Sequence, residues 1–396
     1  MKVLFSSCYP DETFFKLIRE KINISQPAQK FNKLLVKGCC LNGLDVEVAV
    51  AYAGGHKALY EEIATEVYSG HTITYKFCNL EGNYFKRARK KRGFVKQIVD
   101  DFAKQSPDGL LMIDSLSPIA LDLSKEAKKH GLKVITHITD FLEFLLPETK
   151  NPLFYIKNNL LIQRFYRQFD YTDMFVLLTE AMKDKLEIGK RSYLVMDGIC
   201  DYELMEGPKT EKINSDRDIK IFLYSGALCY KYGLKNLVDG FLKADCQKSE
   251  LHLYGDGDYV QELKDVCKRN PRVKYFGVVP NEEMIIKQKE ATFLVNPRPT
   301  KDEYTKYSFP SKNIEYMVSG RPVISTKLPC MTKEYDPYVY YFDEDTVDGI
   351  EKGIKSCCQL EDGCVSDKGL SAKAFILEQK NNAAQIKRFL TRINEV

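Results

Sequence analysis

Residues 308–326 read Ser308-Phe309-Pro310-Ser311-Lys312-Asn313-Ile314-Glu315-Tyr316-Met317-Val318-Ser319-Gly320-Arg321-Pro322-Val323-Ile324-Ser325-Thr326. The pattern predicts a polar loop, a helix with one polar face and then a buried strand. Ser308 suits the N-cap of this helix, Pro310 its first turn and Gly320 its C-terminal stop. This succession of loop, helix and strand is the unit from which the rest of the fold is inferred.

The polar face of this helix suits an anionic, hydroxyl-rich ligand. Lys312 stands in the first turn, where the helix dipole disfavours a cation unless an anion is bound. Glu315 follows about one turn later and can accept hydrogen bonds from sugar hydroxyls. The alternative is a solvated helix that carries a chance Lys/Glu pair.

Length and composition indicate a globular protein of two domains. The chain has 396 residues, of which 44% are hydrophobic and 29% charged, and this length exceeds one ordinary core. The net charge of +4 is small, so the overall balance does not indicate nucleic-acid binding. The first ten residues resemble neither a secretory signal nor a membrane span, so we expect a cytoplasmic protein.

The cysteine pattern argues against a metal site. The twelve cysteines include no C-x-x-C pair, and the five histidines do not supply ligands at zinc-site spacing. We therefore expect reduced thiols and no metal.

Short apolar runs alternate with helical patterns along the whole chain, which predicts an α/β fold with two doubly wound parallel sheets. The expected strands of the first half are 2–6, 45–52, 109–114, 133–138, 174–178 and 192–196, and those of the second half are 220–224, 250–254, 273–276, 292–296, 322–326 and 338–342. The polar stretch 206–217 suits a linker between domains 1–205 and 218–375, and apolar residues at helical spacing predict one terminal helix that includes 376–396.

Ligands of open parallel sheets bind beyond the carboxyl ends of the strands, so the loops there are the candidate site. Gly226 allows close backbone approach, and Lys231 stands before the next helix; a plain turn with a surface lysine is the alternative. Gly255 belongs to a second glycine turn, while Arg298 offers a forked donor for phosphate.

Five segments of the second half carry a family resemblance. They are Y-S-G-A-L-x-x-K-Y-G-L at 224–234, L-Y-G-D-G at 253–257, Y-F-G-V-V-P at 275–280, N-P-R-P at 296–299 and Y-S-F-P-S-K-N-I-E-Y-M-V-S-G-R-P-V-I-S-T at 307–326. In this order they resemble the donor domain of family 4 glycosyltransferases of the bacterial polysaccharide-biosynthesis type. That family has the GT-B fold, with two Rossmann-like domains facing across a cleft and a terminal helix that crosses back to the first domain. The resemblance implies metal-independent, retaining transfer from a nucleotide sugar, which is a substrate rather than a cofactor.

The resemblance assigns roles to individual residues. Glu315 matches the second carboxylate of the family's E-x7-E pattern, which holds the ribose, whereas Tyr307 replaces the first. The turn of Ser308, Phe309, Pro310, Ser311 and Lys312 is implied to grip the diphosphate, and Val278 and Val279 match the loop that edges the base. Gly226, Lys231, Gly255 and Arg298 complete the expected donor site.

In the first half, His137 ends an expected strand and resembles the family's cleft histidine near the acceptor, so we expect it to be catalytic together with Lys312 and Glu315. A satisfied core histidine is the alternative. The tract from Lys86 to Lys96 is basic and flanked by aromatics, which favours an anionic membrane surface over nucleic acid. A solvated charged face is the other interpretation.

Together these features predict a glycosyltransferase that moves a sugar from a nucleotide-sugar donor to a membrane-associated or lipid-linked glycan acceptor. The protein is then expected in the cytoplasm, peripherally bound to the inner face of the membrane. A sugar-nucleotide epimerase of the same fold and a non-catalytic glycan-binding homologue are the alternatives, and a module defined by the basic tract alone would not explain the ordered phosphate-site segments.

Overall fold

The structure, a computed structural model, describes residues 1–7, 26–52, 64–147, 149–205 and 219–395. The chain divides into two compact units. Unit 1 comprises Met1–Ile199 and Asn382–Val396, and unit 2 comprises Cys200–Asn381. The expected linker at 206–217 lies outside the described residues.

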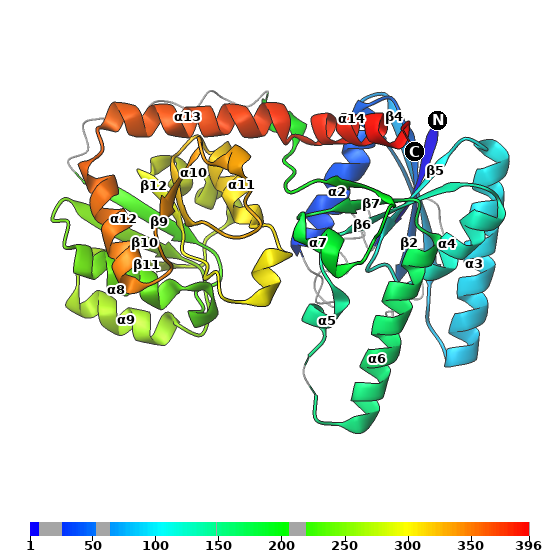
Figure 1. The fold of residues 1–396 in the computed structure, drawn as a ribbon, viewed down its shortest axis with the longest axis horizontal. Helices are drawn as coiled ribbons and strands as arrows, with labels where there is room; N and C mark the ends of the chain where they lie inside the picture. The colour runs from blue at the N-terminus through cyan, green and yellow to red at the C-terminus, as the bar shows by residue number, and fades with distance from the viewer. Residues whose placement is uncertain (8–25, 53–63, 148, 206–218, 396) are drawn as a thin grey trace. The chain divides into compact units, whose positions relative to one another are not determined.

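Unit 1 is built on an eight-stranded sheet with the order β3-β4-β2-β1-β5-β6-β7-β8, in which the β3–β4 pair is antiparallel and the other pairs are parallel (Figure 1). The strands are β1 (Lys2–Ser7), β2 (Asp45–Tyr52), β3 (Ala64–Tyr68), β4 (His71–Asn79), β5 (Leu110–Asp114), β6 (Lys133–Ile138), β7 (Met174–Leu177) and β8 (Ser192–Val195). The six strands expected from the sequence are present. The hairpin of β3 and β4 was missed because its polar residues interrupt the apolar runs.

Helices cover both faces of this sheet, as neighbouring residues of β1 show. Val3 and Phe5 pack in one core with residues of α2 and α14, whereas Leu4 packs in the other with residues of α3 and α4. A strand buried on both faces is the arrangement that parallel sheets require. The helices of unit 1 are α2 (Gln26–Leu41), α3 (Tyr84–Gln105), α4 (Ala120–Lys129), α5 (Leu142–Leu145), α6 (Pro152–Arg167), α7 (Ala181–Lys185) and α14 (Asn382–Ile393).

Unit 2 has a six-stranded sheet with the order β11-β10-β9-β12-β13-β14, and all its pairs are parallel. Its strands are β9 (Lys220–Ser225), β10 (Ser249–Tyr254), β11 (Val273–Gly277), β12 (Phe293–Asn296), β13 (Val323–Thr326) and β14 (Val339–Phe342), as expected. Its α-helices are α8 (Leu234–Ala244), α9 (Val260–Arg269), α10 (Asn281–Glu290), α11 (Ser311–Val318), α12 (Val347–Gln359) and α13 (Asp362–Gln379). These two sheets confirm the predicted α/β class with two doubly wound parallel sheets.

The sequence predicted a single terminal helix. This prediction is wrong in one respect, because Lys380 and Asn381 separate two helices, α13 and α14. Between them, the backbone oxygen of Lys380 accepts a hydrogen bond from the Cys200 N–H at 2.9 Å, and Asn381 pairs with Cys200 as an isolated bridge. These bonds use backbone groups that a continuous helix would keep for itself. α14 then packs on α2 in unit 1, where Gln385 Nε2 donates to the Gly198 oxygen at 2.6 Å.

Among the described residues, no helix has the combination of length and apolar character needed to span a bilayer.

The close packing of α14 on α2 predicts the effect of a Gly38→Ala substitution. An added methyl group would lie 2.6 Å from the Asn382 oxygen and 2.7 Å from Ile386 Cγ1. We expect a loss of about 1–3 kcal/mol in the free energy of unfolding, measured by chemical denaturation. Gly93→Ala in α3 is the matched control, because a methyl group there meets nothing within 4 Å, and it should stabilise by about 0.5–1 kcal/mol. Equal stabilities of the two variants would contradict this account of the packing.

Candidate functional site

The candidate site lies where the strand order of unit 2 reverses. Chain order runs outward from β9 through β10 to β11 on one side, and from β12 through β13 to β14 on the other. The loops that follow β9 and β12 therefore diverge at the carboxyl edge of the sheet and leave a crevice between them. Gly226, Arg298 and the start of α11 all belong to segments at this edge.

Two sets of hydrogen bonds tie α11 to the strands on either side of the crevice. The Tyr316 hydroxyl accepts from the Ser225 N–H of β9 at 2.9 Å and lies 3.3 Å from the Ser225 oxygen. The fully buried Asn313 accepts from Asn296 Nδ2 of β12 at 2.7 Å, while its own Nδ2 lies 3.4 Å from Ser325 Oγ of β13. The sequence motif does not single out Tyr316 or Asn313. Their polarity at otherwise buried positions was the signal that could have revealed them.

Lys312 is held at the end of β9 by this arrangement. Its Nζ donates a short hydrogen bond to the Ser225 oxygen and lies 4.0 Å from the centre of the Tyr224 ring. Burial lowers the pKa of Lys312 to about 8, opposed by the nearby Glu315 carboxylate and reinforced by Arg298. The charged ammonium therefore lacks full compensation in this structure, which is the electrostatic condition for attracting an anion.

Glycine turns bring backbone close to this ammonium. Gly226 has φ of 139° and Gly255 has φ of 132°, both in a region that other residues rarely adopt. A methyl group on Gly226 would collide with Lys312 Nζ, and one on Gly255 would collide with the Gly226 oxygen. The Gly226 N–H donates to the Tyr254 oxygen at 2.9 Å, and the Gly255 N–H donates to the Gly277 oxygen at 2.7 Å. Both positions thus need glycine for the shape of the crevice.

Arg298 supplies a second cation at the site. Its guanidinium lies over the Tyr304 ring with 4.8 Å between the guanidinium carbon and the ring centre. Its Nε is buried and has no hydrogen-bond partner among the described residues, and such a donor normally finds one. Arg298 and Lys312 thus present unsatisfied positive charge at the crevice.

The start of α11 differs in detail from the prediction. Pro310, rather than Ser308, is the N-cap residue, and no side chain within the described ranges caps the helix. Ser308 instead donates its N–H to the Tyr304 oxygen at 3.0 Å, as part of the preceding 3-10 turn. The helix therefore begins at Ser311, and the N-terminal N–H groups are those that an anion could meet.

The other predicted residues of this segment take different positions. Glu315 is exposed one turn beyond Lys312. Tyr307 is half-buried, and its hydroxyl lies 3.4 Å from Glu303. Phe309 is buried against Tyr335, with 5.4 Å between the ring centres, so its side chain serves the core and offers no surface to a donor.

Lys231 lies in the loop that follows β9. It is exposed in a 3-10 turn, with Nζ 5.0 Å from the centre of the neighbouring Tyr232 ring. Its place at the phosphate stays a prediction.

Val278 and Val279 follow β11 at the same edge of the sheet. Val278 is 75% exposed, as a surface for a planar base requires, and Val279 lines a groove of about 450 Å³ under α10. This groove is also lined by Leu223, Tyr254 and Phe276 but not by Lys312 or Arg298. It is therefore a feature distinct from the cationic crevice.

In unit 1, His137 is a core residue rather than an exposed one. It has no exposed surface, and its Nε2 lies 2.7 Å from Asn32 Oδ1, while Asn32 Nδ2 donates to Asp114 at 2.7 Å. Burial lowers the pKa of His137 against the opposing effect of Asp114, so the ring is neutral and donates from Nε2 to Asn32. The ring stacks on Phe5, and its Nδ1 is buried without a hydrogen-bond partner among the described residues. Contact of His137 with substrate stays a prediction.

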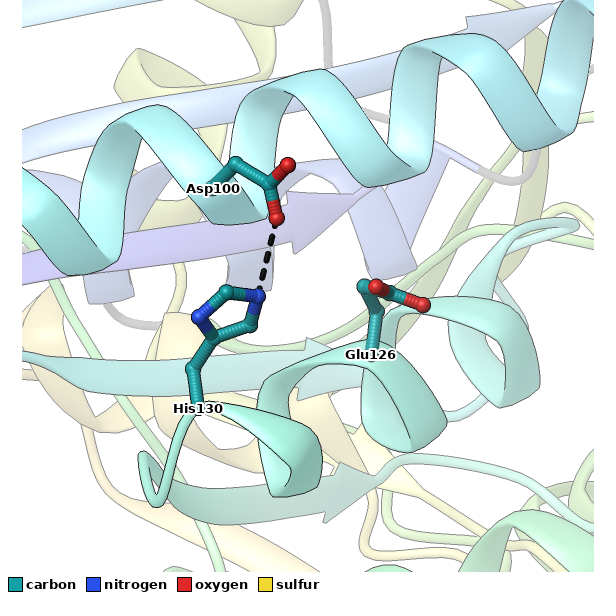
Figure 2. Close-up of side chains that lie close together, drawn as sticks. All are labelled: Asp100, Glu126 and His130. Atoms are coloured by element: carbon teal, nitrogen blue, oxygen red, sulfur yellow. Dashed lines mark ion pairs between the residues drawn. The ribbon is translucent and has the colours of Figure 1, made fainter.

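One cluster of potential metal ligands is found among the described residues, comprising Asp100, Glu126 and His130 (Figure 2). Ion pairs account for it. His130 Nε2 lies 2.8 Å from Asp100, and Lys129 Nζ lies 2.7 Å from Glu126. The cluster joins α3 to the end of α4 and is remote in sequence from the crevice of unit 2.

The lowered pKa of Lys312 predicts that anion binding depends on pH. As pH rises through about 8 the free protein loses the Lys312 proton, so affinity for inorganic pyrophosphate should fall. Calorimetric titration of the wild type and of Lys312→Arg across this range measures the effect. The arginine variant keeps its charge across this range, and the pyrophosphate titrates in the same way with both proteins. The variant therefore shows the part of the pH dependence that comes from the ligand. Parallel pH profiles of the two proteins would contradict the assignment of Lys312 to the anion site.

Three solved structures are similar to this chain over its whole length. HepE (Alr3699) of Anabaena, solved in complex with UDP, has 14% identity and a TM-score of 0.63, with 100% of both chains covered. The lipopolysaccharide outer core galactosyltransferase WaaB in its apo form has 18% identity and a TM-score of 0.60, with 100% of this chain and 99% of that one covered. Sucrose-phosphate synthase (tll1590) of Thermosynechococcus elongatus has 12% identity and a TM-score of 0.62 at the same coverage.

At these identities the likeness establishes the fold, which is GT-B. A search of curated proteins by sequence found no match. The family described as Glycosyl transferases group 1 matches residues 219–356, the part of unit 2 that contains the cationic crevice. Residues 219–356 of unit 2 therefore form a group 1 glycosyltransferase domain, within a chain that has the GT-B fold.

Proposed function

We propose that this enzyme transfers a sugar, with retention of anomeric configuration, from a nucleotide-sugar donor to a membrane-associated or lipid-linked glycan. The observation that carries the proposal is the Lys312 ammonium, fixed at the strand switch point against Gly226 and beside Arg298. The HepE structures contain UDP or UDP-glucose, and WaaB is described as a lipopolysaccharide galactosyltransferase. These neighbours support a nucleotide-sugar donor and a role in bacterial polysaccharide biosynthesis.

In this proposal each part of such a donor has its own residues at the carboxyl edge of the sheet. The diphosphate would lie at the start of α11, bound by Lys312, Arg298 and the N–H groups that begin with Ser311. Glu315, exposed one turn further along α11, would accept hydrogen bonds from the ribose hydroxyls. The base would lie along the exposed Val278 and its neighbour Val279.

Stabilisation of the departing diphosphate is the central chemical task. When the anomeric C–O bond breaks, negative charge develops on the diphosphate, and preorganised cations lower the barrier to this step. The Lys312 ammonium already lies where that charge would form and needs only to exchange its bond to the Ser225 oxygen for one to phosphate. Retention would follow if the acceptor attacks from the face that the diphosphate leaves, with the leaving phosphate taking the acceptor proton.

The residues of unit 1 have a different part in this proposal. The buried His137–Asn32–Asp114 chain lies at the carboxyl ends of β6 and β5 and at α2. It holds these three elements together at the edge where a parallel sheet binds its ligands. We therefore assign His137 to positioning and leave the charge stabilisation to Lys312 and Arg298.

Loss of Lys312 should impair the chemical step. Lys312→Ala is expected to lower turnover by about 10²-fold or more, since one preorganised charge would be absent from the transition state. The measurement is release of nucleoside diphosphate from the donor in the presence of acceptor. Lys352→Ala, which changes an exposed lysine on α12, is the control and should retain wild-type turnover. Near-normal turnover of Lys312→Ala would remove this residue from the mechanism.

The stereochemistry and the reaction class can be tested together. Nuclear magnetic resonance of the product should show the same anomeric configuration as the donor, and inversion would exclude front-face attack. Incubation with donor alone should yield no isomerised sugar nucleotide; its formation would instead favour an epimerase. A thermal-shift screen of nucleotide sugars identifies the donor, because a bound donor stabilises the folded state. A complete lack of stabilisation and turnover would favour a non-catalytic homologue.

A further inference from the structure

Unit 1 carries an exposed apolar helix that the donor chemistry does not use. In the N-terminal half of α6, Leu153 is 77% exposed, Phe154 55%, Ile156 56% and Leu160 61%. The residues from 153 to 157 are all exposed, and Phe165 alone is buried in α6. A helix of a soluble domain normally buries one apolar stripe, whereas the apolar side chains of this half are exposed and are not packed on other described residues of the unit.

The structure fixes how far this segment projects. Arg164 Nη2 of α6 and Lys91 Nζ of α3 both lie 2.7 Å from the same Asp122 oxygen of α4. Asp122 stands in the first turn of α4, so α3 and α6 flank α4 and pass its start. At 1.5 Å per residue, α6 extends about 18 Å beyond Arg164 and α3 about 10 Å beyond Lys91. Figure 1 shows both helices projecting on the same side of unit 1.

The projecting end of α3 is basic and tipped with aromatic side chains. Tyr84 is 80% exposed and Phe85 81% exposed, and the residues that follow are Lys86, Arg87, Arg89, Lys90, Lys91, Arg92 and Lys96. The sequence has no acidic residue from 84 to 96, and none in α6, which adds Lys157, Arg164 and Arg167. Lys91 and Arg164 are paired with Asp122, but basic residues still greatly outnumber acidic ones at this end of the unit. An excess of cations next to exposed apolar side chains is the pattern of a surface that meets anionic headgroups and acyl chains.

We propose that the projecting ends of α3 and α6, together called the two-helix end, dock the enzyme on an anionic lipid bilayer. The apolar side chains of α6 enter the lipid while the cations of α3 bind the headgroups. Charge complementarity favours this occupant over a second copy of the chain, because a symmetric pair would bring two basic surfaces together. The inference deepens the membrane part of the proposed function and does not depend on the donor chemistry.

The absence of tryptophan from the chain allows a direct test of insertion. Phe154→Trp places a single tryptophan on the two-helix end, and Ile286→Trp on α10 is the matched control because its position is also 55% exposed. With vesicles of phosphatidylcholine and phosphatidylglycerol, the fluorescence of Phe154→Trp should shift to the blue and be quenched by brominated lipid. Ile286→Trp should show neither effect. No shift at position 154, or equal shifts at both positions, would overturn the proposal.

Vesicle flotation separates the contributions of the apolar and basic groups. Ile156→Ser/Leu160→Ser and Lys86→Gln/Arg87→Gln/Lys90→Gln should each reduce binding to these vesicles at least tenfold, and binding should be lost on pure phosphatidylcholine. Val67→Ser and Lys352→Gln change exposed residues elsewhere and should bind like the wild type. Unchanged binding by both sets of variants would overturn the proposal, as would a wild-type dimer that the Ile156/Leu160 variant converts to monomer, or retention on RNA in place of vesicles.

The same variants separate this inference from the proposed function. Their stabilisation by nucleotide sugar in the absence of lipid should equal that of the wild type, because the changes lie in unit 1 and the donor crevice lies in unit 2. Failure of vesicle binding with intact donor binding would remove the membrane surface alone. Failure of donor binding in the wild type would remove the proposed function and leave the vesicle results standing.

Discussion

The chemistry of unit 2 depends on how α11 is attached to its sheet. The Tyr316 hydroxyl holds the backbone of Ser225 in β9, and Asn313 bonds to Asn296 in β12. These strands lie on either side of the point where the strand order reverses. One short helix is thereby fixed across the crevice, with its first turn at the carboxyl edge of the sheet. Buried hydrogen bonds suit this task because leaving such groups unsatisfied is costly, so alternative positions of the helix are disfavoured.

The position of the helix creates the electrostatic property of the site. Lys312 is forced against backbone and the Tyr224 ring, where burial disfavours its charge. The Ser225 oxygen compensates only in part, and Arg298 adds a second positive charge. A bound diphosphate would stabilise the charge of Lys312, which solvent cannot do at this buried position. Because the charges are poorly compensated in the free site, they favour binding of an anion. The same charges lower the barrier of the reaction, because the leaving group gains negative charge in the transition state.

Unit 1 uses its buried polar residues for a structural purpose. Asn32 of α2 links His137 to Asp114, and all three residues are buried. A polar residue at the carboxyl edge of this sheet can therefore position neighbouring elements without taking part in the reaction. The projecting ends of α3 and α6 show the reverse situation, since most of their apolar and basic residues face solvent.

The sequence by itself determined the α/β class, the two parallel sheets and the segment that forms the cationic crevice, because apolar runs and glycine turns are local patterns. It missed the hairpin of β3 and β4, whose strands alternate with polar residues, and the break at Lys380 and Asn381, which depends on the distant Cys200. Only the tertiary structure decided that His137 is covered and that Tyr316 and Asn313 position the helix. Each of these outcomes depends on which residues from remote parts of the chain become neighbours. Strand order and packing determine these neighbours, and the local spacing of residues in the sequence does not.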